Sequence, residues 1–292
     1  MFCSCKRGGF SGCLGRKNKM KTSEFSDGFR VKPGSRVNLK KIDPGFSAGF
    51  KSKKETKDLL DDNIERLNEL QYRLYAENRR SVLIVFQAMD AGGKDGCIRH
   101  VMTGLNPQGC RVTSFKVPSK EELDHDFLWR IHKSVPPRGE IGIFNRSHYE
   151  DVLVVRVHNL APKSVWSKRY DQINDFEKIL SENGTTVLKF FLYISKAEQK
   201  QRFIKRLENP DKNWKFSLGD VEERKFWEDY MRAFEAALSK CSTDHAPWYI
   251  IPANNKWFRN LAVSQIIADT LAEMDPRIPK PEEDLSGIVI PD

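Results

Sequence analysis

Long apolar runs are missing from this 292-residue sequence, and none approaches the length needed to span a membrane. The first residues, MFCSCKRGGFSGCLGRK, also lack the apolar core of a secretory signal. Cysteine is scarce, with six residues and no paired metal-type spacing beyond one C-x-C near the start. We therefore expect a cytoplasmic protein with reduced thiols and no membrane partner, and a zinc site at Cys3, Cys5 and Cys13 is disfavoured.

Acidic residues are outnumbered by basic ones, 40 against 49, which leaves a formal net charge of +9 at pH 7. Such an excess indicates an anionic partner without identifying it. No RNA-recognition, zinc-finger or helix-turn-helix signature is legible, and the organised basic residues cluster around phosphate-type motifs. Nucleic acid is therefore not the expected partner.

The order of predicted elements favours one large α/β domain. Residues 1–30 are rich in Gly, Ser and Lys, and we expect a flexible basic segment outside the core. Residues 31–275 are predicted to form the catalytic domain, and the Pro-rich residues 276–292 an extended tail. No internal repeat is evident.

Strand-like and helix-like segments alternate through the predicted domain. Helical spacing runs from residue 57 to about 78, and the strand-like runs that follow cover 82–87, 111–116, 141–144, 186–194 and 248–251. This order predicts a three-layer αβα sandwich on a five-stranded, mostly parallel sheet. In such sheets ligands bind at the carboxyl ends of the strands, so the residues after each strand are the candidates for function.

The segment QAMDAGGKDG, at 87–96, follows the first predicted strand and is typical of a loop that holds phosphate. Its phosphate contacts are predicted to be Ala91, Gly92, Gly93, Asp95 and Gly96, with Lys94 as a mobile positive charge. The standard loop, G-x-x-x-x-G-K-[ST], carries a hydroxyl that binds Mg²⁺, but Asp95 stands there and Ala88 replaces the first glycine. The nearby carboxylates Asp90 and Asp95 are therefore the candidate Mg²⁺ ligands, and Asp90 is the predicted one. A plain strand-to-helix turn is the alternative.

A second motif, FNRSHYED at 144–151, follows the third predicted strand. In phosphate-loop proteins an Asp commonly ends this strand, but Asn145 takes its place here and Arg146 follows. Arg146 can grip phosphate oxygens with two donors. The alternative is that Asn145 caps the next helix and that Arg146 pairs with Glu150.

A third, basic cluster follows the fourth predicted strand. Arg202, Lys205 and Arg206 share one face of a predicted helix, and the repulsion between them calls for an anion. A second helix is predicted to start at Asp220, with Glu223 completing a capping box, and it carries Arg232. A basic helix, loop and helix at about 200–232 is typical of the closing lid of nucleotide kinases, and a solvated surface hairpin is the alternative.

Four long segments resemble the polyphosphate kinase 2 family, and most closely its class III branch, whose members phosphorylate AMP and ADP. They are QAMDAGGKDG at 87–96, NPQGCRVTSFKVPS at 106–119, LDHDFLWRIHK at 123–133 and IGIFNRSHYEDVLVVRVH at 141–158, and the similarity covers roughly 30–275. The resemblance implies a P-loop kinase-like fold, Mg²⁺ and phosphate transfer between inorganic polyphosphate and adenine nucleotides. Two departures are Ala88 and Gly92, where Gly and Ala are more usual.

By this resemblance, individual positions take the family's roles. The catalytic positions are Asp90, Lys94, Asn145, Arg146, Arg202 and Arg206, with Arg232 as a further phosphate contact. Lys205 is predicted to contact phosphate from its place on the basic helix. The nucleoside is placed near residues 114–129, so that Phe127 or Trp129 stacks near the base, Lys116 contacts its phosphate and Asp124 binds ribose or a metal. Glu150 is a further metal or acceptor contact. Core packing is the alternative for both aromatic residues.

A homo-oligomer, dimer or tetramer, is expected.

An acceptor phosphate is already ionised near neutral pH, so a nucleotide kinase needs positioning and positive charge rather than a strong base. Two alternatives stay open at this point. One is an ATP-dependent nucleoside or thymidylate-like kinase, and the other is a phosphate-loop protein that binds RNA or polyphosphate without turnover.

Overall fold

The computed structural model describes residues 22–286, 288 and 290–291. Its centre is a sheet of five parallel strands in the order β2-β3-β1-β4-β5. The strands are β1 (Ser81–Gln87), β2 (Cys110–Ser114), β3 (Ile141–Asn145), β4 (Thr185–Tyr193) and β5 (Trp248–Pro252). Each predicted strand is present within two residues of its expected bounds, and the predicted α/β class is confirmed.

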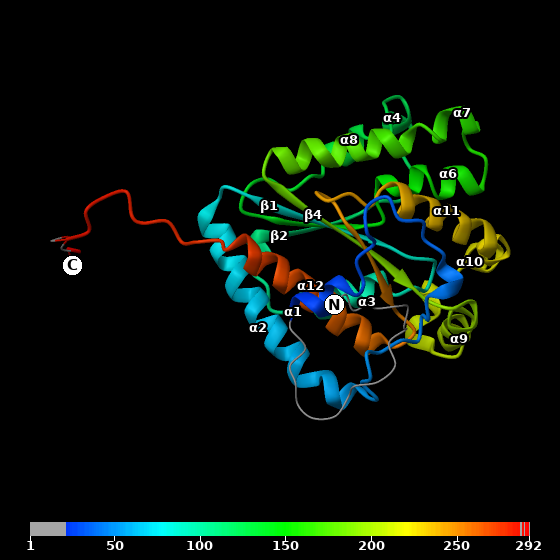
Figure 1. Ribbon diagram of the computed structural model, residues 1–292, viewed down its shortest axis with the longest axis horizontal. Helices are drawn as coiled ribbons and strands as arrows, with labels where there is room; N and C mark the ends of the chain where they lie inside the picture. The colour runs from blue at the N-terminus through cyan, green and yellow to red at the C-terminus, as the bar shows by residue number, and fades with distance from the viewer. Residues whose placement is uncertain (1–21, 287, 289, 292) are drawn as a thin grey trace, which may run out of the picture.

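Helices cover both faces of this sheet (Figure 1). On one side lie α1 (Thr22–Asp27), α2 (Lys53–Glu77), α3 (Lys94–Val101) and α12 (Lys256–Met274). On the other side lie α8 (Arg169–Glu182) and α11 (Trp227–Lys240). Phe234 of α11 stacks on Phe191 of β4 with ring centroids 4.3 Å apart, so α11 packs directly against the sheet. Because β1 is covered on both faces, all seven of its residues are buried.

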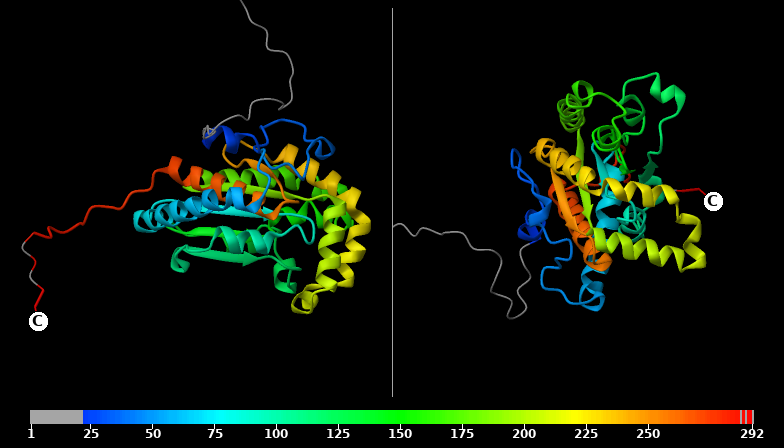
Figure 2. Two further views of the ribbon diagram at one scale, coloured as in Figure 1. Left: turned by 90° about the horizontal axis from the view of Figure 1, so that it is seen from below. Right: turned by 90° about the vertical axis from the view of Figure 1, so that its right-hand side faces the viewer.

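Short helices complete the structure near the carboxyl ends of the strands. They are α4 (Lys120–Leu123), α5 (Trp129–His132), α6 (Val154–Val157), α7 (Lys163–Trp166), α9 (Lys196–Leu207) and α10 (Leu218–Glu223). Five 3-10 turns cover Leu39–Lys41, Pro107–Gly109, His148–Asp151, Pro210–Lys215 and Arg224–Phe226. Figure 2 shows α9, α10 and α11 standing together at one end of the molecule. That end is the carboxyl edge of the sheet, where the candidate site lies.

The core extends further toward the N-terminus than the sequence predicts. Phe25 of α1 packs edge-on against Phe29, and Phe29 contacts Phe258 of α12 with ring centroids 6.0 Å apart. Arg30 forms an antiparallel bridge with Tyr249 of β5. The expectation that residues up to 30 stay outside the core is therefore wrong for 25–30, because the Gly, Ser and Lys content hid Phe25 and Phe29, an apolar pair one helical turn apart. Cys3, Cys5 and Cys13 lie outside the described residues.

The chain beyond α12 leaves the body as an extended, exposed segment (Figure 1). Among the residues that the structure describes, no helix combines the length and apolar character needed to cross a membrane. The described cysteines, Cys97, Cys110 and Cys241, are free thiols. Burial raises the pKa of Cys97 to about 11, so this thiol stays protonated near neutral pH.

Candidate active site

The phosphate-type loop joins β1 to α3 at the centre of the sheet. Two of its residues take left-handed backbone conformations, Ala91 with φ 59° and Gly93 with φ 99°. Lys94 opens α3 and is buried, and its Nζ donates to the Ala88 carbonyl at 3.1 Å. Burial lowers the pKa of this ammonium group, although the Asp90 carboxylate acts in the opposite direction. The loop therefore holds a cation that a bound anion would stabilise.

Gly92 is in close contact with the start of the same loop. Its N–H donates to the Met89 carbonyl at 2.8 Å, which closes a tight turn. A Cβ atom at position 92 would lie 2.5 Å from the Ala88 Cβ and 2.7 Å from the Met89 oxygen. The methyl group of Ala88 thus occupies the space that a side chain at 92 would need. The missing side chain at 92 therefore matches the methyl group at 88.

The second motif places an amide and a guanidinium beside this loop. Asn145 ends β3, and its Nδ2 donates to Asp95 Oδ1 at 2.8 Å. Arg146, with φ 64°, reaches Asp90 Oδ1 with Nη2 at 3.0 Å. The 3-10 turn that follows is capped by Ser147, whose hydroxyl accepts from the Tyr149 N–H. The alternative in which Asn145 caps this segment is therefore wrong.

Electrostatics set the protonation of these groups. Burial opposes the charge on Arg146, but the carboxylates of Glu150 and Asp90 outweigh it and raise the pKa of the guanidinium. Burial raises the pKa of Glu150 despite the nearby charges of Arg146 and Lys94. Burial also acts to raise the pKa of Asp95, but the Asn145 hydrogen bond and the Lys215 charge lower it overall. The positive charge of Arg146 therefore lies near the carboxylates of Asp90 and Glu150.

A fully buried polar network supports the second motif from below. The Glu177 carboxylate of α8 accepts from the Tyr149 hydroxyl at 2.9 Å and lies 3.1 Å from His148 Nε2. Lys189 of β4 donates to the same carboxylate, to the Tyr149 oxygen at 2.9 Å and to the Cys241 carbonyl at 2.6 Å. Although burial opposes it, Lys189 and His148 lower the pKa of Glu177. This network fixes the turn that carries Arg146 and Glu150.

Glu177→Ala is expected to lower the free energy of unfolding by about 3 to 5 kcal/mol, because it leaves the buried Lys189 ammonium without its carboxylate. Urea denaturation followed by circular dichroism measures this loss. Glu182→Ala, on the exposed end of the same helix, is the matched control and should unfold like the wild type. Equal stability of the two variants would contradict the role given to the network.

The predicted lid consists of α9, the turn at Pro210–Lys215, α10, the turn at Arg224–Phe226 and α11. Arg206 Nη1 lies 3.4 Å from Asp220 Oδ2, and Lys215 Nζ lies 3.7 Å from Asp95 Oδ2, so the lid contacts the phosphate-type loop. The predicted capping box at Asp220 is wrong. Helix α10 begins at Leu218, because the Ser217 hydroxyl, which accepts from the Gly219 N–H at 3.1 Å, caps it first.

Arg202 lies beneath the loop rather than above it. Its Nη1 donates to the carbonyls of Ala91 and Gly92, both at 2.9 Å, and its Nε binds Glu198 at 2.7 Å. The side chain is buried, so its charge is satisfied inside the protein. The expectation that a bound anion offsets its repulsion from Lys205 and Arg206 is therefore corrected, because Glu198 and the loop carbonyls already do so.

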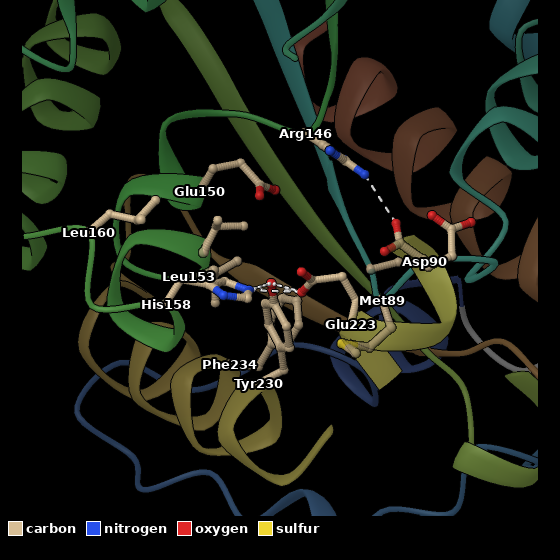
Figure 3. Close-up of a pocket in the computed structure, with 13 residues that line it drawn as sticks. Met89, Asp90, Arg146, Glu150, Leu153, His158, Leu160, Glu223, Tyr230 and Phe234 are labelled. Atoms are coloured by element: carbon tan, nitrogen blue, oxygen red, sulfur yellow. Dashed lines mark hydrogen bonds and ion pairs between the residues drawn. The ribbon is translucent and has the colours of Figure 1, made fainter. Parts of the chain in front are cut away.

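Two pockets meet at Asp90, Arg146 and Asp220, which line both. The loop pocket, of about 550 Å³, is lined by the phosphate-type loop and by Ser114, Phe115, Lys116, Asn145, Arg206, Trp214 and Lys215. The carboxylate pocket, of about 370 Å³, is lined by Glu150, Glu223, His158, Tyr230 and several apolar side chains (Figure 3). The loop pocket carries five basic groups against three carboxylates, which suits an anion.

At the far end of the carboxylate pocket, three side chains from different elements converge (Figure 3). Glu223 Oε2 accepts from the Tyr230 hydroxyl at 2.7 Å and lies 2.9 Å from His158 Nε2. Burial, followed by the Glu223 carboxylate, raises the pKa of Tyr230. Glu223 belongs to the lid, so this contact ties the lid to the turn after α6. The pocket thus combines an apolar wall with groups that can hydrogen-bond a ligand.

Comparison with known proteins identifies the family. The profile of the family described as Polyphosphate kinase 2 matches residues 50–279, most of the chain. The chain belongs to this family. Among its polyphosphate kinase 2 relatives, the AMP/ADP-polyphosphate phosphotransferase of Meiothermus ruber is 53% identical over 266 residues, which cover 90% of this chain and 98% of that protein.

Two further members of the polyphosphate kinase 2 family are nearly as similar. The ADP-polyphosphate phosphotransferase of Rhodopseudomonas palustris is 49% identical over 274 residues, 90% of this chain and 93% of that one. The crystal structure of Polyphosphate Kinase 2 from Arthrobacter aurescens superposes with a TM-score of 0.86 at 45% identity, covering 90% and 94% of the two chains. The family resemblance found in the sequence is confirmed.

Most sequence-predicted residues of this polyphosphate kinase 2 family member come together. Those lining the loop pocket are Asp90, Ala91, Gly92, Gly93, Lys94, Asp95, Gly96, Lys116, Asn145, Arg146 and Arg206. Glu150 lies with Asp90 and Arg146 on the carboxylate pocket. The contiguous loop and the second motif therefore form one centre, as their positions after neighbouring strands predict.

Six predicted residues line neither pocket: Arg202, Lys205, Arg232, Asp124, Phe127 and Trp129. Lys205 and Asp124 are exposed, and Arg232 pairs with Asp229 on the surface of α11. The ring of Phe127 is covered by the Arg169 guanidinium at 4.8 Å. Trp129 stacks on His125 at 4.0 Å and faces Lys133 at 3.9 Å. Arg202 contacts the loop from beneath, and the other five residues do not line the loop pocket.

Sequence reasoning missed several pocket residues: His158, Trp214, Lys215, Asp220, Glu223, Tyr230 and Phe234. Trp214 and Lys215 belong to a basic, aromatic turn in the predicted lid, and this signal was available. No local sequence pattern indicates the contacts among His158, Glu223 and Tyr230, because 65 residues separate His158 from Glu223.

Proposed function

We propose that the protein transfers a phosphoryl group from inorganic polyphosphate to AMP or ADP. The observation that carries this proposal is the cationic loop pocket, which shares Asp90 and Arg146 with a second pocket that has a partly apolar wall. A long polyanion suits the first pocket, and a nucleotide suits the second. The family and the printed names of the two similar phosphotransferases support the same reaction.

The proposed mechanism relies on positioning and charge. An acceptor phosphate oxygen is ionised near neutral pH, so no strong general base is required. Lys94 and Arg146 would neutralise charge on the transferring group, and Arg206 and Lys215 would hold the donor chain from the lid side. Because the two pockets share Asp90 and Arg146, donor and acceptor phosphates would meet there.

Magnesium fits this site as a proposed cofactor. Asp90 and Glu150 face the carboxylate pocket with hard oxygen ligands, which Mg²⁺ prefers. Among the described residues no group of three or more His, Cys, Asp or Glu side chains could hold a metal ion. Mg²⁺ typically keeps water and substrate phosphates as ligands, so the protein needs to supply only one or two. Asp90, with Glu150 as a second contact, would meet this need. When bound, the ion would neutralise phosphate charge.

The two alternatives are less well supported. An ATP-dependent nucleoside kinase needs a base for a hydroxyl nucleophile, and the relatives are named for polyphosphate chemistry. A binding protein without turnover would not need Asp90, Lys94 and Arg146 together in one pocket, yet all three line the loop pocket. The homo-oligomer and the cytoplasmic location stay predictions, and light scattering tests the first.

The test is to incubate purified protein with Mg²⁺, AMP or ADP, and either polyphosphate or ATP, and to resolve the nucleotides formed. We expect product with polyphosphate as donor. Product formed only with ATP would favour a nucleoside or nucleotide kinase of the usual type.

Turnover with polyphosphate is expected to fall steeply with salt. Because several Lys and Arg contacts displace counterions, kcat/KM should drop roughly tenfold or more between about 50 and 200 mM salt. Steady-state rates at increasing potassium chloride measure this. Rates that stay constant over this range would argue against a long polyanion in the loop pocket.

A further inference from the structure

The carbonyl groups of four successive loop residues are each held by a buried side chain. Gln199 Nε2 donates to the Asp90 carbonyl at 2.9 Å. Arg202 Nη1 donates to those of Ala91 and Gly92. Arg259 Nη1 donates to the Gly93 carbonyl at 3.1 Å. The donors come from α9 and from α12, which are distant in sequence and converge behind the loop.

Fixing the carbonyls also fixes the amide hydrogens. In a trans peptide the C=O and the following N–H point in opposite directions, so carbonyls turned toward α9 and α12 leave the N–H groups of 91–94 facing away from them. The Gly92 N–H is used by the Met89 carbonyl. In the described part of the chain, those of Ala91, Gly93 and Lys94 have no protein acceptor. Successive unpaired N–H groups of this kind form an anion-binding concavity.

Arg259 is unlike the other donors in its charge balance. It is 2% exposed, and its Nε and Nη2 donate to Asn260 Oδ1 at 3.1 and 2.7 Å. Arg202 is paired with Glu198, whereas no described carboxylate lies within ion-pair distance of Arg259. A buried charge without a counterion is costly to the fold. A Cβ at Gly93 would lie 2.2 Å from Arg259 Nη1, so the guanidinium is pressed against the loop.

We propose that Arg259 is a positioning residue, which holds the phosphate loop in its anion-binding conformation and keeps a positive charge directly behind it. The inference rests on the proposed function only in taking a phosphate chain as the anion. The cost of burying this charge is offset when the polyanion binds on the other side of the loop. Gln199 acts in the same way on the Asp90 carbonyl, without charge.

Arg259→Ala tests this role, with Arg80→Ala as the matched control. Like Arg259, Arg80 donates to a backbone carbonyl, that of Met274, but it is only partly buried, lies away from the site and pairs with Glu77. For each variant, kcat and KM for polyphosphate are measured below the melting temperature, together with the rise in Tm that tripolyphosphate produces. Free guanidinium ion at low concentration is added to Arg259→Ala as a rescue.

For Arg259→Ala we expect kcat to fall about tenfold or more, because the loop is no longer held in register with the substrate. The Tm rise with tripolyphosphate should shrink, and guanidinium should restore part of kcat. Arg80→Ala should lose Tm but keep both readouts. Wild-type kcat, KM and tripolyphosphate response in Arg259→Ala would overturn the proposal.

If Arg259→Ala does not fold, Arg259→Lys takes the same measurements, since a lysine keeps the charge but presents one donor point instead of a fork. An unchanged kcat and an unchanged tripolyphosphate response in that variant would also overturn the proposal. If the wild type shows no polyphosphate-dependent turnover, the proposed function fails, while the tripolyphosphate shift in Tm still tests Arg259.

Discussion

Asp90→Asn is expected to lower kcat by about 100-fold to 1000-fold while leaving the fold intact. The amide keeps an oxygen that can accept from Arg146, now 3.0 Å from the carboxylate, so the loop should stay in place. It loses the negative charge that would hold Mg²⁺ where the two pockets meet. Steady-state turnover over a range of Mg²⁺ concentrations measures the effect, and circular dichroism checks the fold.

Asp95→Asn is the matched control for this variant. Asp95 stands where the usual phosphate loop has its metal-binding hydroxyl, but its carboxylate is 70% exposed and is engaged by Asn145 and Lys215. We expect a much smaller loss of kcat than for Asp90→Asn. The reverse order, or near-normal turnover of Asp90→Asn, would transfer the metal site to Asp95 and refute the assignment of Asp90.

Gly92→Ala is expected to reduce kcat by about 100-fold, because its Cβ would overlap the Ala88 Cβ and the Met89 oxygen and so displace the loop from the reacting phosphates. The carbonyl of residue 92, now bound to Arg202, would move with it. Turnover with polyphosphate and ADP measures the loss, with the Tm of each variant as a check on folding.

Ala88→Gly is expected to rescue Gly92→Ala. Removing the methyl group at 88 frees the space that the new side chain at 92 requires, and the double variant restores the order of Gly and Ala more usual in the family. Ala88→Gly alone should cost only about 1 kcal/mol of stability, from added backbone freedom. A double variant as inactive as Gly92→Ala would show that the Met89 carbonyl, and not Ala88, decides the packing. The four variants together form a double-mutant cycle.

The central strand and its loop were predictable because their signals are contiguous. An apolar run, a glycine-rich turn, a lysine and a helix follow one another within 82–101, and each is local in origin. Asn145 and Arg146 were placed beside this loop because parallel strands end at the same edge of a sheet, and β1 pairs in register with β3 up to Asn145. Long motifs made the family recognisable as well.

The contacts of single side chains were much harder to predict. Arg202 lies on the same helical face as Arg206, yet it turns under the loop while Arg206 lines the pocket, because the carbonyls of Ala91 and Gly92 are in its reach. Phe127 and Trp129 follow β2 as a nucleoside contact should, but cationic side chains cover their rings. Helical periodicity predicts the face of the helix on which a side chain lies. It does not predict which groups from other elements that side chain contacts.

By itself, the sequence determined the α/β class, the order of elements, the phosphate loop and the family, since these depend on local periodicity and on unbroken motifs. Only the tertiary structure decided that Arg259 and Gln199 hold the loop from behind and that Glu223 joins His158 and Tyr230. These contacts link residues more than a hundred positions apart, or separate helices. Close packing selects such partners, and no local pattern encodes them.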